Sequence, residues 1–178
     1  NDIIDAWRPR LVVCEFPRAL FASLCSLNNY KNGDKQKAKR LREKFRPYLQ
    51  MCRQISEYQR EHQMEFLIQV PVNGSVDLGD ELRCVETHDE TYLAVSDFCV
   101  FGLRHPKSGQ PIKRRTCWLT SSPEIAVELN KNCSCKKAHA PIVGGAVVRY
   151  TADLPYELTV AILKGFRGTV LRKYFPRI

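Results

Sequence analysis

The sequence lacks the features of a membrane or secreted protein. No apolar run approaches the roughly 18 residues that a membrane-spanning helix needs. The N-terminal residues also lack the basic and then apolar pattern of a signal peptide. We therefore expect a soluble, intracellular protein with no membrane partner, and the choice between nucleus and cytoplasm stays open.

In three places the chain also lacks the acidic residues that would balance its Lys and Arg. Residues 31–46 hold eight Lys or Arg against two acids, and residues 104–115 and 164–178 each hold five against none. Clustered positive charge attracts phosphates, so this pattern is typical of a protein that binds DNA or RNA. The alternative is that these residues form solvated faces of helices and loops. The residues expected to contact nucleic acid are Lys35, Lys37, Lys39, Arg40, Arg42, Lys44, Arg104, Lys113, Arg114, Arg115, Arg167, Arg172, Lys173 and Tyr174.

In other respects the composition is ordinary. At 178 residues the chain is long enough for one full domain that buries about 70% of the surface exposed by the unfolded chain. Hydrophobic residues make up 44% and charged residues 26%, which argues against wholesale disorder. A chain of this size does not need its eight cysteines as a disulfide framework, so we expect reduced and mostly buried thiols.

Apolar runs alternate with segments of helical periodicity. The predicted strands are Leu11–Phe16, Glu65–Val72, Thr91–Val95 and Arg115–Thr120, and the predicted helices are Asp34–His62, Asp80–Thr87, Pro123–Asn130 and Pro155–Leu163. Gly165 is expected to end the last helix. This alternation indicates an α/β fold with a mostly parallel sheet flanked by helices. We expect one domain over residues 1–165 and a basic aromatic C-terminal tail over residues 166–178, which would bind nucleic acid or dock on a neighbouring protein.

Five short blocks follow one another in a characteristic order. The blocks are Phe16-Pro17-Arg18 with Phe21, Glu65 to Pro71, Asp97-Phe98-Cys99-Val100-Phe101-Gly102-Leu103, Lys113 to Ser122 with Cys135, His139 and Gly144-Gly145, and Leu154 to Gly165. In this order they resemble the DNA cytosine-5 methyltransferase-like domains carried by some retroelement polyproteins. The resemblance covers roughly residues 9–165 and implies a fold similar to the catalytic half of a Rossmann-like, S-adenosylmethionine-dependent methyltransferase.

At the positions that do the chemistry, the sequence departs from this family. The family has a Pro-Pro-Cys turn and a strand that ends in Glu-x-Pro, where this chain has Pro17 with Arg18 and Gln69 with Pro71. In cytosine methylation the cysteine thiolate attacks the base while the glutamate protonates the ring nitrogen. Because Arg18 is no nucleophile and Gln69 cannot supply the proton, we expect no catalysis.

We expect that cofactor binding is lost as well. The resemblance implies a glycine-rich turn well upstream of Pro9, but only eight residues precede Pro9 here. We therefore expect an inactive methyltransferase-like domain that binds no cofactor and acts as a nucleic-acid-binding or structural module in a larger assembly. Two alternatives stay open: one half of a split methyltransferase whose cofactor half lies on another chain, and a structural adaptor that binds an acidic protein.

One group of metal-ligand residue types, which overlaps these blocks, is a possible site of its own. Cys133, Cys135 and His139 are closely spaced soft ligands, and either Cys117 or Cys99 could complete a set of four around zinc. The spacing is not that of a standard zinc finger or knuckle. We therefore favour two loop cysteines near a histidine and expect no metal.

Overall fold

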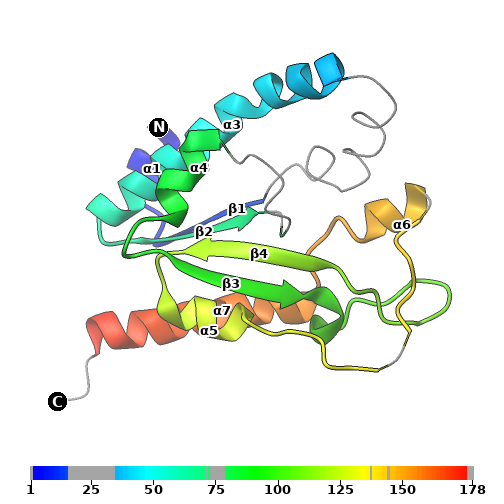
Figure 1. Cartoon of the computed structure of the whole chain (residues 1–178). Coiled ribbons are helices and arrows are strands. Elements are labelled where there is room, and N and C mark those ends of the chain that lie inside the picture. Colours follow the sequence, from blue (N-terminus) through cyan, green and yellow to red (C-terminus); the bar gives the residue numbers. More distant parts are fainter. Residues whose placement is uncertain are drawn as a thin grey trace. The chain divides into compact units, whose positions relative to one another are not determined.

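The computed structural model describes residues 2–15, 35–70, 72, 79–136, 138–143 and 145–175. These residues form an α/β fold in which a mixed four-stranded sheet is flanked by helices (Figure 1). The order of the strands is β1-β2-β4-β3. The chain divides into two compact units: unit 1 is Asn1–Thr91 with Leu119–Ser121, and unit 2 is Tyr92–Trp118 with Ser122–Ile178. The single domain that the sequence predicts over residues 1–165 stays a prediction.

Unit 1 contains two parallel strands covered by helices. Its elements are α1 (Asp2–Trp7), β1 (Leu11–Cys14), α3 (Lys35–Glu61), β2 (Glu65–Val70) and α4 (Gly79–Glu86). The register places Leu11 opposite Glu65 and Cys14 opposite Ile68. In Figure 1, α3 and α4 lie on the same side of this strand pair. The predicted parallel pairing is thus present in β1 and β2.

One face of α3 supplies much of the core of unit 1. Cys52 and Ile55, which follow the helical spacing seen in the sequence, are buried. Gln59 continues this face, and its Nε2 donates hydrogen bonds to the backbone oxygens of Pro9 at 2.9 Å and Glu65 at 2.7 Å. A single buried amide therefore ties the helix to the start of both strands.

Unit 2 contains a β-hairpin and a pair of packed helices. Its elements are β3 (Tyr92–Asp97), the 3-10 helix η3 (Phe98–Phe101), most of β4 (Arg115–Thr120), α5 (Pro123–Leu129), α6 (Gly145–Tyr150) and α7 (Tyr156–Tyr174). The arrows of β3 and β4 point in opposite directions in Figure 1. The loop between them is closed by an antiparallel bridge from Arg104 to Pro111. This hairpin makes the sheet mixed, whereas the sequence predicts a mostly parallel one.

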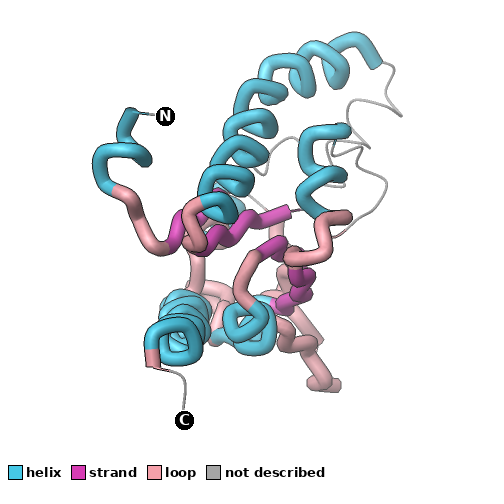
Figure 2. Tube along the Cα trace, turned by 90° about the vertical axis from the view of Figure 1, so that its left-hand side faces the viewer, coloured by secondary structure: helices cyan, strands magenta, loops and turns pink. Residues whose placement is uncertain are grey.

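Gly165, which the sequence predicts to end a helix, is explained by the close packing of α5 against α7. Figure 2 shows the two helices side by side and nearly end on. Gly165 lies inside α7 and does not end it. A Cβ atom at this position would lie 2.6 Å from Cα of Ile125. The glycine is therefore needed because the two helix backbones approach each other here.

The residues predicted as an appended tail belong largely to α7. The helix continues without interruption to Tyr174, because Leu158, Ala161, Ile162, Gly165 and Thr169 form one buried face along it. Of the segment 166–178, only residues 176–178 lie outside the described residues. In the part of the chain that the structure describes, no helix combines the length and the apolar character needed to cross a membrane.

Candidate metal centre

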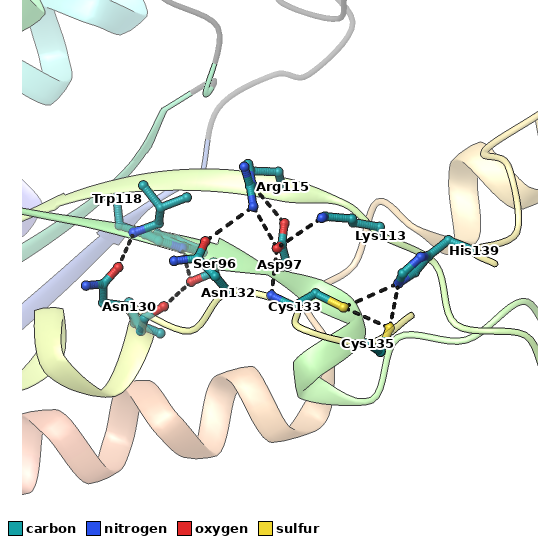
Figure 3. A network of polar contacts seen from close by, with 12 residues as sticks. Ser96, Asp97, Lys113, Arg115, Trp118, Asn130, Asn132, Cys133, Cys135 and His139 are labelled. Carbon is teal, nitrogen blue, oxygen red and sulfur yellow. Dashed lines mark hydrogen bonds and ion pairs between the residues drawn. The ribbon is translucent and has the colours of Figure 1, made fainter. Parts of the chain in front are cut away.

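Three cysteines and one histidine of unit 2 meet beside η3. Cys99 lies in η3, and Cys133, Cys135 and His139 lie in the loop that follows α5. One ligand atom from each of Cys99, Cys133 and His139 lies within 4.8 Å of the other two. Nε2 of His139 is 3.5 Å from Sγ of Cys133 and 3.3 Å from Sγ of Cys135, and the two sulfurs are 2.9 Å apart. Figure 3 shows these last three side chains pointing toward one another.

Asp97 holds the two segments of this cluster together. Its carboxylate is fully buried and accepts a hydrogen bond of 2.8 Å from the backbone N–H of Cys133. It also accepts two hydrogen bonds of 2.9 Å from the guanidinium of Arg115, and Nζ of Lys113 lies 3.7 Å away (Figure 3). Only one residue separates Asp97 from Cys99. The segment that carries Cys99 therefore also holds Cys133 in place, through the hydrogen bond from its backbone to Asp97.

Two buried aromatic side chains fix η3 on either side of Cys99. Phe98 and Phe101 point into the core of unit 2, while Cys99 is half-buried. The short helix ends at Gly102, whose φ of 82° belongs to the left-handed region that glycine adopts without strain. The Asp-x-Cys-x-Phe-Gly block therefore has a local role in this chain, since it fixes one ligand residue and turns the chain away from it.

The start of the second segment is attached to β3 and β4. Ser96 Oγ donates to the backbone oxygen of Leu129, and it accepts a hydrogen bond of 3.1 Å from Nε1 of Trp118. Asn130 Oδ1 accepts a bond from the backbone N–H of Val95 at 3.3 Å. These contacts, drawn in Figure 3, place the loop before it reaches its first cysteine.

Hydrogen bonds within the cluster separate the pKa values of its thiols. Hydrogen bonds from the side chain and backbone of Cys135 lower the pKa of the Cys133 thiol to about 6. Burial, together with the hydrogen bond to Cys133, raises the pKa of the Cys99 thiol to about 12. Cys133 is therefore the first of the two to ionise, and the thiolate is the form of cysteine that binds a metal.

The four donors match the preferences of zinc. Three thiolates and one imidazole form a standard set for a structural zinc ion. With Zn–S bonds of about 2.3 Å, two sulfurs of a tetrahedral site lie about 3.8 Å apart. The sulfurs of Cys133 and Cys135, at 2.9 Å, are closer than this. Zinc binding would therefore require these two sulfurs to move apart, and Cys135 is the exposed one of the two.

The cations predicted in the 104–115 segment all lie in unit 2, and each makes a contact there. Lys113 and Arg115 pair with Asp97. Arg114 donates to the backbone oxygen of Thr151, and its guanidinium lies 4.6 Å from the ring centre of Phe98. Arg104 donates to the backbone oxygen of Gly109 at 3.3 Å. Lys113, Arg114 and Arg115 thus take part in the folding of the hairpin.

The other predicted nucleic-acid contacts lie on helices of different units. Arg40 and Lys44 are exposed on α3 of unit 1, and the side chains of Lys35, Lys37, Lys39 and Arg42 on the same helix lie outside the described residues. On α7 of unit 2, Arg167, Lys173 and Tyr174 are exposed, and Arg172 binds the carboxylate of Glu124.

Of the four positions that the resemblance places at the catalytic site, the structure describes only Gln69. Gln69 lies in β2 and is 2% exposed. Pro17, Arg18 and Pro71 lie outside the described residues.

The prediction of reduced and mostly buried cysteines is confirmed only in part. The seven described cysteines are all free, as predicted, but only Cys14, Cys52 and Cys117 are buried. Of the two residues considered as a fourth ligand, Cys99 is the one that the structure places with Cys133 and His139. No spacing rule points to Cys99, because it is distant in sequence and is brought in by the hairpin.

Comparison with known proteins assigns no function to this group of residues. The resemblance to cytosine methyltransferase-like domains therefore stays a prediction. No protein-family model matches the chain, and no curated protein and no solved structure matches it either.

Proposed function

We propose that unit 2 is a zinc-binding module in which a structural zinc ion joins η3 to the loop that follows α5. The observation that carries the proposal is the meeting of Cys99, Cys133 and His139 within 4.8 Å, with Cys135 in contact with the last two. These ligands come from segments far apart in sequence. A metal ion bound to them closes a long loop and stabilises the folded unit.

The number of protein ligands favours a structural role over a catalytic one. A catalytic zinc ion keeps one coordination position for water or substrate, whereas a structural ion has four protein ligands. Here Cys99, Cys133 and His139 lie close together and Cys135 contacts the last two, so the cluster offers four protein donors. The hydrogen bond from the backbone of Cys133 to Asp97 fixes the loop from outside, as the outer partners of zinc ligands commonly do.

Metal analysis of the purified full chain tests this proposal directly. We expect one zinc ion per chain. Replacement of zinc by Co²⁺ is expected to give the absorption bands of tetrahedral cobalt with thiolate ligands. Cys99→Ser and Cys133→Ser should each abolish stoichiometric zinc binding, because each removes a thiolate while keeping a side chain of similar size.

Cys84→Ser is the matched control, since Cys84 is an exposed cysteine of α4 in unit 1. This variant should bind zinc as the unaltered chain does. A chain that binds no zinc under reducing conditions, or a Cys133→Ser variant that keeps its zinc, would overturn the proposal. Circular dichroism of each variant checks that the unit remains folded.

A second proposal concerns the chain as a whole and retains the interpretation from sequence. We propose a catalytically silent, Rossmann-like methyltransferase relative in which Gln69 replaces the proton donor. The burial of Gln69 in β2 supports this, because a buried amide holds a hydrogen-bonding position but supplies no proton. The test is thermal unfolding with S-adenosylmethionine. The proposal predicts no shift in Tm, and a reproducible increase would contradict it.

A further inference from the structure

A pocket of about 540 Å³ lies beside the zinc ligands within unit 2. The three cysteines of the cluster form part of its wall. The rest of the wall includes Val100, Arg104, Gln110, Pro111, Asn132 and Ser134. The volume falls within the range of about 300–1,000 Å³ that is typical of small-molecule sites.

The wall of this pocket combines apolar surface with hydrogen-bonding side chains. Val100 and Pro111 offer apolar contact, and Gln110 offers an amide that can both donate and accept. Asn132 offers the N–H groups of its amide, since its Oδ1 accepts from Arg115 at 3.4 Å. A nucleobase has the matching chemistry, since its faces are apolar and its edges carry donors and acceptors. Asn and Gln amides are the side chains that pair with such edges in two-bond contacts.

The segments around the pocket are strongly basic. Residues 98–115 and 131–139 contain eight Lys or Arg and no Asp or Glu. Lys113 and Arg115 are paired with Asp97, and Lys131 is paired with Glu128. Among the described residues, the remaining cations of these segments that make no ion pair include Arg104, Lys107 and Lys136. A zinc ion with three thiolates and a neutral imidazole carries a net charge of about −1, so the surface stays positive.

A single strand fits this combination better than a duplex does. In a duplex the bases are stacked and paired, so that none can enter a pocket without being flipped out at a cost. Unpaired bases are free to leave the stack and bind in pockets, while their phosphates contact nearby cations. An acidic protein surface would use the cations but would leave the amide-lined pocket without a matching group.

We infer that this pocket and the cations beside it form a binding site for single-stranded nucleic acid. One base occupies the pocket against Gln110 and Asn132, and the neighbouring phosphates contact Arg104, Lys107 and Lys136. The inference rests on the proposed zinc site, because zinc fixes the loop that carries Asn132 and Lys136. It narrows the predicted nucleic-acid surface from three charged segments to one face of unit 2.

The test uses the zinc-loaded full chain, with the zinc content of each sample measured before binding. Fluorescence anisotropy is followed with labelled RNA and DNA strands of about 12 nucleotides, and with a duplex of the same length, over a series of salt concentrations. We expect the strands to bind more tightly than the duplex. Three phosphate contacts predict that log K falls with log salt with a slope of about −2.

Two kinds of variant separate the pocket from the cations. The triple variant Arg104→Gln, Lys107→Gln, Lys136→Gln should bring the salt slope close to zero, because it removes the phosphate contacts. Gln110→Ala should lower the affinity about tenfold and leave the slope unchanged, since it removes a base contact. Arg83→Gln, which removes one exposed cation from α4 of unit 1, is the control for net charge and should change neither quantity.

Several results would overturn the inference. One is that the zinc-loaded protein binds neither strand, and another is that it binds the duplex as tightly as a strand. Competition by a free mononucleotide that equals competition by a strand would also overturn it, as would polyglutamate binding as tight as nucleic-acid binding. Unchanged binding by the triple variant would overturn it as well. The zinc measurement keeps the two proposals apart, because loss of strand binding with zinc present contradicts only this inference.

Discussion

Two regions of unit 2 are held together by different forces. The pair of helices α5 and α7 is held by apolar burial, with Ile125 and Leu129 packed in the same core as Leu158 and Ile162. The loop that follows α5 has no buried side chain among the described residues of 131–139, and it depends on a buried carboxylate and on close sulfur and nitrogen atoms. Apolar packing is non-directional and spread over many atoms, whereas coordination and ion pairing depend on a few. This loop should therefore fail first, and it should fail at single residues.

The largest expected effect is that of zinc removal. Structural zinc contributes an apparent 10–16 kcal/mol, roughly, to the folding of zinc-finger peptides. Unit 2 has an apolar core of its own, so we expect its helices to survive chelation. Hydrogen exchange should show that amides of residues 131–139 lose protection while those of α5 and α7 keep most of theirs. Tm should fall by about 10 °C or more, at about 4–8 °C for each kcal/mol in a unit of this size.

Equal loss of protection in the loops and in the helix pair would erase the contrast between the two regions. The addition of zinc after chelation should restore both protection and Tm. The Cys133→Ser variant is the control for this experiment, because it should show the weaker protection from the start and should not respond to chelation.

Asp97→Ala is expected to have the next largest effect. It leaves the backbone N–H of Cys133 and the guanidinium of Arg115 without the buried carboxylate that accepts from both. Loss of the hydrogen bonds to this buried carboxylate costs about 3 kcal/mol in the free energy of unfolding, and little of this comes from the ion pair itself because Arg115 is 44% exposed. Since the same carboxylate orients the loop, zinc affinity should also fall, by about 10-fold to 100-fold. Urea unfolding and competition with a zinc chelator measure the two effects.

Asp97→Asn is the matched variant, because it keeps the shape of the side chain and an oxygen that can accept from Cys133. It should lose less zinc affinity than Asp97→Ala. If both variants bind zinc as the unaltered chain does, Asp97 supports the fold but does not position the ligands.

In the helix pair, the expected effect is concentrated at one glycine. Gly165→Ala places a Cβ atom 2.6 Å from Cα of Ile125, where only movement of a helix backbone can relieve the clash. We expect it to lower the free energy of unfolding by about 2–3 kcal/mol. At Gly168 a Cβ atom would meet only the side chain of Glu124, at 3.3 Å. Gly168→Ala should be neutral or stabilising by up to about 1 kcal/mol, because alanine favours the helix. Similar losses for the two variants in urea unfolding would contradict this account.

The smallest expected effect is the pH dependence contributed by Glu124. Burial raises the pKa of this carboxyl, but the hydrogen bonds from Arg172 and Thr169 outweigh burial and hold it below its ordinary value of 4.5. The folded state therefore binds fewer protons than the unfolded state near this pH. The contribution to stability is complete above the unfolded pKa and is lost as the pH falls through the folded pKa.

Glu124→Gln should remove this contribution. Because Arg172 is about half exposed, the loss should be less than about 1 kcal/mol at neutral pH and should vanish in acid. Urea unfolding at about pH 7 and about pH 3 measures the difference. Asp153→Asn, at an exposed position of the same unit, is the control. A loss that is equal at both pH values would show that Glu124 acts through packing and not through charge.

The sequence predicts elements well where local patterns decide them. β4 has the predicted bounds Arg115–Thr120, and α5 begins at Pro123 after the N-cap Ser122, whose Oγ accepts from the backbone N–H of Ile125. In each case neighbouring residues carry the signal. The expectation that Gly165 ends the helix is wrong because here a distant part of the chain decides. A glycine near the end of a periodic segment is commonly a helix stop, and only the tertiary approach of α5 shows another use for it.

For the candidate metal centre the sequence shows some of the residues, but it does not predict a metal there. Cys133, Cys135 and His139 are close in sequence and stand out as a group. Cys99 joins them because Asp97, two residues earlier, binds the backbone of Cys133 in the loop that follows α5. That contact depends on the turn at Gly102 and on the pairing of β3 with β4. The fourth ligand is thus a property of the folded hairpin and cannot be read from spacing along the chain.

The burial of Trp118 gives unit 2 an optical signal of its own. Its indole is fully enclosed and donates a hydrogen bond to Ser96, in the network that leads to the metal centre. The other tryptophan of the chain, Trp7, belongs to unit 1 and is 81% exposed. Acrylamide should therefore quench the emission of Trp7 and spare that of Trp118. The emission that survives the quencher reports on unit 2 without a label.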